Sequence, residues 1–212
     1  MLPGMKRRYA LISMLALTLL GACNAEKTET TEKSGEAETA AVEGTKVRMK
    51  TNKGDIVIEL NAGKAPITVK NFLKYVGDKH YDGTVFHRVI DGFMIQGGGF
   101  ALDGGNLVEK KTGEGIKNES QNGLKNDKGT IAMARTNNPD SATAQFFINV
   151  ADNHFLDKAQ AQDGWGYAVF AKVVDGMDVL NKIKAVPTGT SGFHRDVPKD
   201  TVLIESAEIV EG

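Results

Sequence analysis

The sequence predicts a mainly β fold with two α-helices, and three observations support this prediction. Short runs in which apolar and polar residues alternate recur between residues 47 and 210, and such alternation is the pattern of half-buried strands. Only two segments, 66–76 and 177–183, are predicted to be helical. Glycine is frequent, with 24 in 212 residues, whereas aromatic residues make up 7%. This composition is typical of a turn-rich β protein rather than of a helical bundle.

The first expected elements are a hairpin and a helix. Residues 47–51 and 55–60 alternate in character and are joined by Asn52-Lys53-Gly54, which favours a tight turn. In the helix expected at 66–76, Pro66 stands in the first turn, where its missing N–H costs nothing. An apolar stripe at helical spacing then follows: Val69, Phe72, Leu73 and Val76.

The rest of the chain is predicted to supply further strands and the second helix. These strands are expected at about 84–90, 93–97, 129–134, 145–149, 167–173 and 202–210. Residues 101–128 show little periodicity, and a loop of that length is uncommon in a compact domain and usually functional. Many short strands with two helices fit an antiparallel barrel whose ends the helices cover, although the pattern alone does not establish closure.

Length and charge limit the functional classes. The 212 residues are 41% hydrophobic, which suits one globular domain with additional sequence. The formal net charge is −1, and this near-neutral balance argues against a nucleic-acid partner, because phosphate recognition normally leaves a basic patch.

The additional sequence lies at the N-terminus and predicts export. Basic residues 6–8 precede an apolar run at residues 11–20, which is too short to cross a bilayer that needs about 20 residues in a helix. Residues 1–22 are therefore interpreted as a signal peptide. The run ends in Leu20-Gly21-Ala22-Cys23, which resembles a bacterial lipobox and predicts a lipid on Cys23. The alternative is an ordinary signal peptide with an incidental cysteine.

Residues 23–45 are expected to be the lipidated cysteine and a disordered tether, followed by the folded domain at 46–212. The tether has no aromatic residue and more Glu than Lys, so it cannot repay the entropy of ordering. The prediction is a protein of the cell envelope that faces the periplasm and contacts the membrane through its lipid. Asn24 follows the cysteine, and the resemblance to lipoprotein sorting signals implies that the absence of Asp at this position favours the outer membrane if the source is Gram-negative.

The segment 86–100 carries the candidate chemistry. It sets Arg88 among alternating apolar residues, and after a turn come Phe93, Met94 and Gln96. A single guanidinium on a strand beside aromatic and thioether groups suits a site that grips an apolar peptide segment. The guanidinium can also donate a hydrogen bond to the peptide backbone.

This stretch resembles the signature of the cyclophilins, the peptidyl-prolyl cis/trans isomerases, over roughly residues 46–210. The resemblance implies a closed eight-stranded antiparallel β-barrel capped by two α-helices, and a monomer that acts on unfolded or flexible proline-containing polypeptides. It assigns catalysis to Arg88, Phe93 and Gln96, with Gln96 orienting the arginine and Met94 completing an apolar floor. No covalent bond breaks in this reaction, so neither cofactor nor metal is expected.

Two further motifs follow in the order of the family. Residues 133–148 place Ala134 and Arg135 at main-chain contacts with peptide, and residues 153–157 continue the site. The remaining contact positions are Gln145, Phe147, Phe155, Leu156 and Tyr167. Many eukaryotic members carry a cyclosporin-contacting tryptophan in place of Phe155, so tight binding of that drug is not expected. The insert 158–165 resembles the bacterial branch.

Plainer interpretations compete at several positions. Arg88 alone could be a surface arginine, and Phe93, Met94 and Phe147 could be core residues, as Phe146 is expected to be. His87 is better interpreted as a packed structural histidine than as an acid or base. His80, His154 and His194 lack metal-ligand spacing. Two rival functions also stay open: a binding module that uses the same groove, and a structural lipoprotein that spaces partners.

Overall fold

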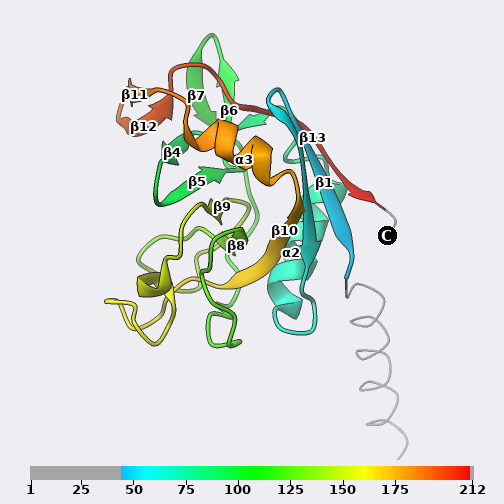
Figure 1. Ribbon diagram of the computed structural model, residues 1–212. Helices are drawn as coiled ribbons and strands as arrows, with labels where there is room; N and C mark the ends of the chain where they lie inside the picture. The colour runs from blue at the N-terminus through cyan, green and yellow to red at the C-terminus, as the bar shows by residue number, and fades with distance from the viewer. Residues whose placement is uncertain (1–43, 211–212) are drawn as a thin grey trace, which may run out of the picture.

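A strongly curled antiparallel β-sheet forms most of the protein in the computed structural model, which describes residues 44–210 (Figure 1). The strands in chain order are β1 (Lys46–Thr51), β2 (Gly54–Leu60), β3 (Thr84–Val85), β4 (Arg88–Ile90), β5 (Met94–Gly97), β6 (Phe100–Asp103), β7 (Asn106–Glu109), β8 (Thr130–Met133), β9 (Phe146–Asn149), β10 (Val169–Asp175), β11 (Thr188–Ser191), β12 (His194–Pro198) and β13 (Leu203–Val210). The helices are α2 (Pro66–Gly77), α3 (Met177–Lys184) and the short 3-10 helix η1 (His154–Leu156). The predicted class, mainly β with two α-helices, is confirmed.

The predicted signal peptide, Cys23 and nearly all of the predicted tether lie outside the described residues. Within residues 44–210, no helix has both the length and the apolar character needed to cross a membrane.

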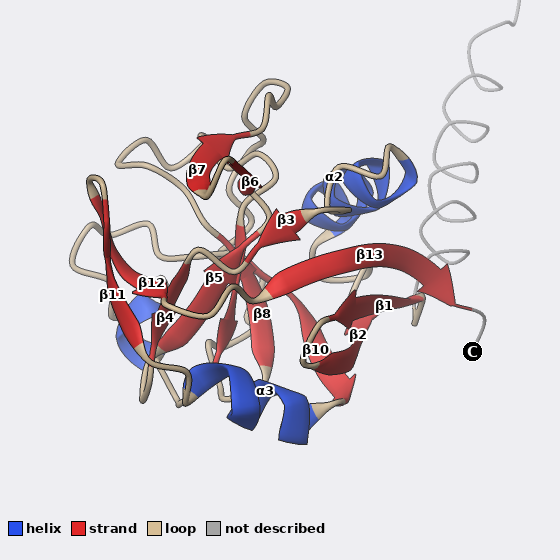
Figure 2. Ribbon diagram, turned by 90° about the horizontal axis from the view of Figure 1, so that it is seen from above, coloured by secondary structure: helices blue, strands red, loops and turns tan. Residues whose placement is uncertain are grey.

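Eleven strands form one sheet in the order β4-β5-β9-β8-β10-β2-β1-β13-β3-β6-β7, and β11 pairs with β12 in a separate hairpin. The predicted first hairpin is present, because β1 and β2 pair from Lys46↔Glu59 to Thr51↔Gly54. On its other side β1 pairs with β13, where Lys46 lies opposite Val210. The first and last strands of the described chain are therefore neighbours (Figure 2).

The closed eight-stranded barrel is not confirmed, since the sheet has eleven strands and its order ends at β4 and β7. The physical reason lies in residues 84–90, which the sequence predicts as one strand. Instead β3 pairs with β13 and β6, whereas β4 pairs with β5. Phe86 and His87 separate the two pieces. β4, at one end of the sheet, and β3, near the other end, are therefore consecutive in the chain. No ladder of hydrogen bonds between these two strands closes the sheet into a barrel.

Two hairpins occupy regions for which the sequence predicts no strand. The stretch 101–128 begins with the β6–β7 hairpin, which turns at Gly104 and Gly105. The rest of that stretch has a structural role at α2, because the Glu119 carboxylate accepts hydrogen bonds from the N–H groups of Ile67 and Thr68 at 3.1 and 2.8 Å. Such acceptors satisfy the donors left free at a helix N-terminus. The second hairpin is β11–β12.

The main core gathers aromatic side chains around α2. The ring centroid of Phe72 lies 5.1 Å from those of Tyr81 and Phe170 and 5.9 Å from that of Phe146, and all four side chains are buried. On the opposite side of the strands, α3 contributes buried apolar residues (Figure 2). Phe146 belongs to this core, as expected, whereas its neighbour Phe147 packs in a smaller cluster with Met94, Ala132 and Val169. Neighbouring residues on a strand point to opposite faces, so β9 connects the core to the candidate site.

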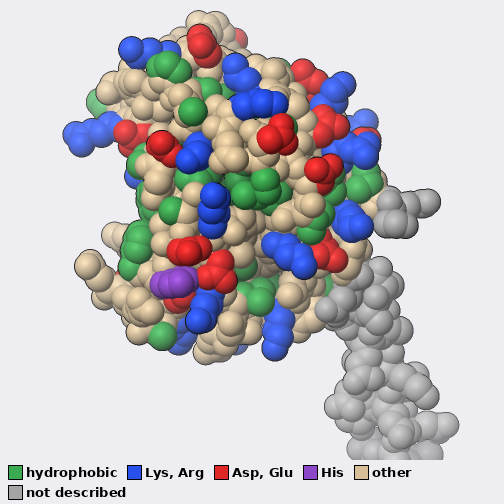
Figure 3. All heavy atoms as spheres, viewed as in Figure 1, with side chains coloured by type: hydrophobic (Ala, Val, Ile, Leu, Met, Phe, Trp, Pro, Cys, Tyr) green, Lys and Arg blue, Asp and Glu red, His purple; other side chains and the backbone are tan. Residues whose placement is uncertain are grey.

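Charged side chains of both signs are interspersed over the face in Figure 3, with hydrophobic side chains between them. This distribution agrees with the near-neutral net charge of the chain.

Candidate active site

A pocket of about 140 Å³ lies over the smaller apolar cluster. Its walls come from β4, β5, the end of β8, β9, η1 and the segment before β10. The lining residues are Arg88, Phe93, Met94, Gln96, Ala134, Arg135, Phe147, Leu156 and Tyr167. The pocket thus contains nine of the eleven peptide-site residues predicted from the sequence. The roles assigned to them stay predictions.

Strand register explains why these residues meet. Arg88 lies opposite Gln96 in the β4–β5 pair, and Gln96 lies opposite Phe147 in the β5–β9 pair. Directly opposed residues in antiparallel strands project from the same face. Arg88, Gln96 and Phe147 therefore form a row across three strands, and Met94, two residues before Gln96, shares that face.

The two predicted residues outside the lining lie directly beside it. Gln145 accepts a hydrogen bond from the Gln96 side-chain amide at 3.0 Å. Phe155 stacks on Phe93 with ring centroids 5.7 Å apart and is 54% exposed, so it extends the apolar wall towards solvent. On the inner side, Tyr167 meets Phe147 edge-on at 5.6 Å.

Arg88 stands at the edge of the pocket and forms an ion pair that the sequence analysis did not predict. Its Nε lies 3.7 Å from Oδ2 of Asp196 on β12. The hydrogen bond recorded for Gln96 goes to Gln145 rather than to Arg88, so the predicted orienting role of Gln96 is not visible here. Asp196 was missed because the β11–β12 hairpin was not predicted. The one sequence signal for this hairpin is Gly192, a turn residue between two short polar runs.

Gly99 has a steric role beside this polar pair. A Cβ atom at Gly99 would overlap the side chain of Gln145. Glycine at this position therefore allows Gln145 to reach Gln96 beside the pocket, and this requirement accounts for the last residue of the Gly97-Gly98-Gly99 run.

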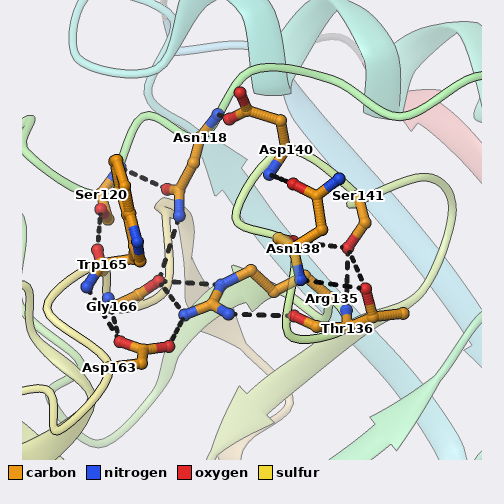
Figure 4. Close-up of polar contacts among 10 residues, drawn as sticks. All are labelled: Asn118, Ser120, Arg135, Thr136, Asn138, Asp140, Ser141, Asp163, Trp165 and Gly166. Atoms are coloured by element: carbon orange, nitrogen blue, oxygen red, sulfur yellow. Dashed lines mark hydrogen bonds and ion pairs between the residues drawn. The ribbon is translucent and has the colours of Figure 1, made fainter.

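Arg135 contributes its side chain as well as its main chain, which the sequence analysis did not anticipate. The side chain is 3% exposed and forms an ion pair with Asp163. Its Nε and Nη2 also donate to the Gly166 carbonyl at 3.1 and 2.9 Å (Figure 4). The guanidinium lies 4.4 Å from the centroid of the Tyr167 ring. Arg135 thus fixes the loop before β10 and, with it, one wall of the pocket.

The same loop has a low-pKa carboxyl group. Hydrogen bonds from Arg135, and from the N–H groups of Gly166 and Trp165, lower the pKa of Asp163 to about 2. Loop 110–128 closes the network, since the Asn118 side-chain amide donates to the Gly166 carbonyl at 3.2 Å and Ser120 donates to the carbonyl of Trp165.

Ala134 shows which main-chain groups a peptide can use. Its N–H already donates to the Gln145 carbonyl at 2.9 Å. A bound peptide must therefore pair with other main-chain groups of residues 134–135. At Ala134, the group left for the predicted contact is the carbonyl.

His87 is buried away from the pocket. It is 5% exposed, its ring lies 4.6 Å from that of Phe100, and its Nδ1 has no hydrogen-bond partner among the described residues. Desolvation, with smaller contributions from His194 and Arg88, lowers the pKa of His87 to about 4. The ring is therefore neutral at pH 7, in agreement with a packed structural histidine.

One cluster of possible metal ligands was not expected from the sequence. Asp127, Asp152 and His154 place their ligand atoms within 4.8 Å of one another. His154 Nε2 already contacts Asp127 Oδ1 at 2.7 Å, and Asp152 accepts a hydrogen bond from the N–H of Lys128 at 2.8 Å. Both aspartates are exposed, and none of the three residues lines the pocket.

The fold and the pocket together define a class: a β protein that offers a small pocket, with apolar and polar side chains in its wall and the Arg88 guanidinium among them, to a segment of polypeptide. The family model described as cyclophilin type peptidyl-prolyl cis-trans isomerase/CLD matches residues 46–209. The chain belongs to the cyclophilin family and is a peptidyl-prolyl cis/trans isomerase.

Individual relatives support this assignment. The chain is 60% identical over 166 residues to peptidyl-prolyl cis-trans isomerase B of Escherichia coli K12, covering 78% of this chain and 99% of that protein. It is 59% identical over 169 residues to a peptidyl-prolyl cis-trans isomerase of Acinetobacter baylyi, covering 80% and 87%. A solved cyclophilin-type isomerase of Cryptosporidium parvum matches with a TM-score of 0.63 at 30% identity, covering 79% of this chain and 98% of that one. The same protein has been solved in the presence of the dipeptide Ala-Pro, with a TM-score of 0.62.

Proposed function

We propose that Arg88 catalyses X–Pro rotation by donating a hydrogen bond to the prolyl nitrogen while the pocket holds the proline ring. The observation that carries the proposal is the row of Arg88, Gln96 and Phe147 across three strands, which sets a guanidinium at the edge of an apolar pocket. Asp196 approaches Arg88 at Nε, so the terminal nitrogens of the guanidinium can donate to a bound peptide.

The chemistry of the amide bond explains why these two parts suffice. Resonance gives the X–Pro bond a barrier of about 18–20 kcal/mol, and the nitrogen regains its lone pair when the amide is twisted. A charge-assisted hydrogen bond to that lone pair contributes about 1.5–3 kcal/mol, or roughly ten- to hundredfold in rate. Further acceleration has to come from desolvation of the proline ring against the apolar side chains of the pocket and from preorganised binding. The reaction breaks no covalent bond and needs no cofactor.

The size of the pocket indicates the substrate. A volume of about 140 Å³ is well below the roughly 300–1,000 Å³ of pockets for drug-sized ligands. It suits one proline residue, while the flanking peptide lies on the open surface beside Phe155. We infer that the substrates are proline-containing polypeptides in unfolded or flexible states. The pocket is complete within one chain, which supports action as a monomer.

We place this activity in the cell envelope on the evidence of the sequence. A signal peptide at 1–22 and a lipid on Cys23 would hold the domain at a membrane surface, facing the periplasm, where it would act on folding exported proteins. Incorporation of an alkyne-labelled fatty acid tests this placement. We expect labelling of the wild-type protein and none of Cys23→Ser, and an unlabelled wild-type protein found in the soluble fraction would contradict it.

The experiment for catalysis is NMR exchange spectroscopy on an Ala-Pro peptide with the purified protein and its Arg88→Ala variant. We expect fast exchange with the wild type and a loss of roughly ten- to hundredfold in the variant. Peptide binding should largely be kept, which distinguishes catalysis from a binding module. Unchanged exchange in a folded Arg88→Ala protein would refute the proposed role of the arginine.

A further inference from the structure

The β11–β12 hairpin brings a carboxylate to the candidate catalytic arginine. Asp196 Oδ2 lies 3.7 Å from Arg88 Nε, and each side chain is 42% exposed. Gln96, which faces Arg88 across the β4–β5 pair, donates its side-chain hydrogen bond to Gln145 instead. Among the described residues, Asp196 is thus the carboxylate that pairs with Arg88.

Aromatic contacts hold this hairpin against the sheet. The ring of His194, two residues before Asp196, lies 5.0 Å from the ring of Phe100. Phe100 in turn lies 4.6 Å from the ring of His87, the chain neighbour of Arg88. At the other end of β12, Pro198 is buried. Asp196 is therefore on a supported strand beside β4 rather than on a free loop.

The backbone of Asp196 also indicates a specific placement. Its φ is +60°, and the only other described non-glycine residue with positive φ is Lys79. Among L-residues, Asn and Asp adopt this left-handed conformation more readily than others, so aspartate fits the backbone at this position.

A guanidinium on a flexible stem has to be held in one direction before it can serve a transition state. At 3.7 Å the contact between Asp196 and Arg88 is an ion pair rather than a hydrogen bond, and an exposed ion pair contributes little to folding stability. We propose that Asp196 is a positioning residue, which holds the Nε edge of Arg88 so that the terminal nitrogens point to the bound prolyl amide. This inference rests on the proposed catalytic role of Arg88.

The test uses Asp196→Asn, because asparagine matches aspartate in shape and accepts the left-handed backbone. NMR exchange and coupled kinetics on an Ala-Pro peptide give kcat and KM separately. We expect kcat to fall about two- to tenfold, which corresponds to the cost of immobilising one flexible side chain. KM and the thermal midpoint should stay close to those of the wild type. Asp200→Asn, which removes an exposed carboxylate just beyond β12, should leave kcat unchanged.

The same substitution in the Arg88→Ala background separates positioning from general damage. If Asp196 acts through Arg88, Asp196→Asn has no further effect there. Wild-type kcat in the single variant, or an equal loss in both backgrounds, overturns the inference. Full activity of Arg88→Ala alone instead overturns the proposed function. Should Asp196→Asn fail to fold, ¹⁵N relaxation of the Arg88 Nε–H in the wild type decides: an ordered group supports positioning and a mobile one refutes it.

Discussion

His87 makes the stability of this domain sensitive to mild acid. Its ring is 5% exposed and its Nδ1 lacks a partner among the described residues, and burial lowers its pKa from 6.5 to about 4. Between these values the unfolded chain binds a proton that the folded protein does not. Protonation therefore favours unfolding, and folding stability declines as pH falls from 6.5 towards 4.

The size of this effect follows from the two pKa values. Each pH unit between them corresponds to about 1.4 kcal/mol, so the full loss between pH 6.5 and pH 4 is about 3 kcal/mol. At pH 5 the loss is already about 2 kcal/mol. These are large fractions of the roughly 5–15 kcal/mol that holds an ordinary domain folded.

Urea unfolding of the wild type and His87→Leu at several pH values between 7 and 4 measures the effect. Leucine removes the titrating group and the unpaired polar atom while keeping a similar volume, so the free energy of unfolding of the variant should gain about 3 kcal/mol relative to the wild type across this range. His87→Gln, which is polar but does not titrate, should show the same relative trend whatever its stability at pH 7. Parallel pH dependences in all three proteins would refute the reasoning.

Three further predictions concern contacts that support the site or the start of helix α2. Arg135→Met should remove the contacts with Asp163, Gly166 and Tyr167 and lower the free energy of unfolding by about 2–3 kcal/mol. The KM for Ala-Pro peptides should rise. An unchanged thermal midpoint and KM would contradict the structural role of the buried guanidinium. Glu119→Ala should remove the acceptor of the Ile67 and Thr68 N–H groups and cost about 1–2 kcal/mol in urea unfolding, whereas a loss below about 0.5 kcal/mol would show that water replaces the cap. Gly99→Ala should displace Gln145 and slow the cis/trans exchange of the peptide severalfold. Adding Gln145→Ala to the same protein should relieve the steric conflict. An exchange rate equal to that of the wild type in Gly99→Ala would show that the Gln96–Gln145 pair is dispensable.

Most of the site residues could be predicted from the sequence because the family resemblance identified them, whereas strand register explains why they meet. Register could not be predicted this way, because a turn confined to Asp91 and Gly92 would place Arg88 opposite Ile95. The turn in the structure also includes Phe93 and places Arg88 opposite Gln96, and a period of two then places Met94 on the same face as Gln96. Alternation along the strand assigned Phe146 to the core, and the family resemblance assigned Phe147 to the site; the structure places them in the two different clusters. The family resemblance then supplied the residues of more distant segments, such as Tyr167.

The features that sequence reasoning missed depend on contacts between distant segments. The division of residues 84–90 at Phe86 and His87 arises because β13 and β5 compete for one segment from opposite ends of the sheet, and an alternating pattern does not reveal that. The β11–β12 hairpin is short and polar, so it lacks a hydrophobic signal, and Asp196 was missed with it. The inward direction of the Arg135 side chain depends on a loop 28 residues further along the chain.

The pairing of β1 with β13 affects the order of events when the chain is made. Strand β2 can form its hairpin with β1 early, but the other edge of β1 stays uncovered until residues 203–210 have been synthesised. Loop closure over such a distance is slow compared with local pairing. β3, which ends three residues before Arg88, relies on the same late strand. The segment that leads into the active site therefore gains its strand neighbour late in folding, and until then β1 presents an exposed strand edge.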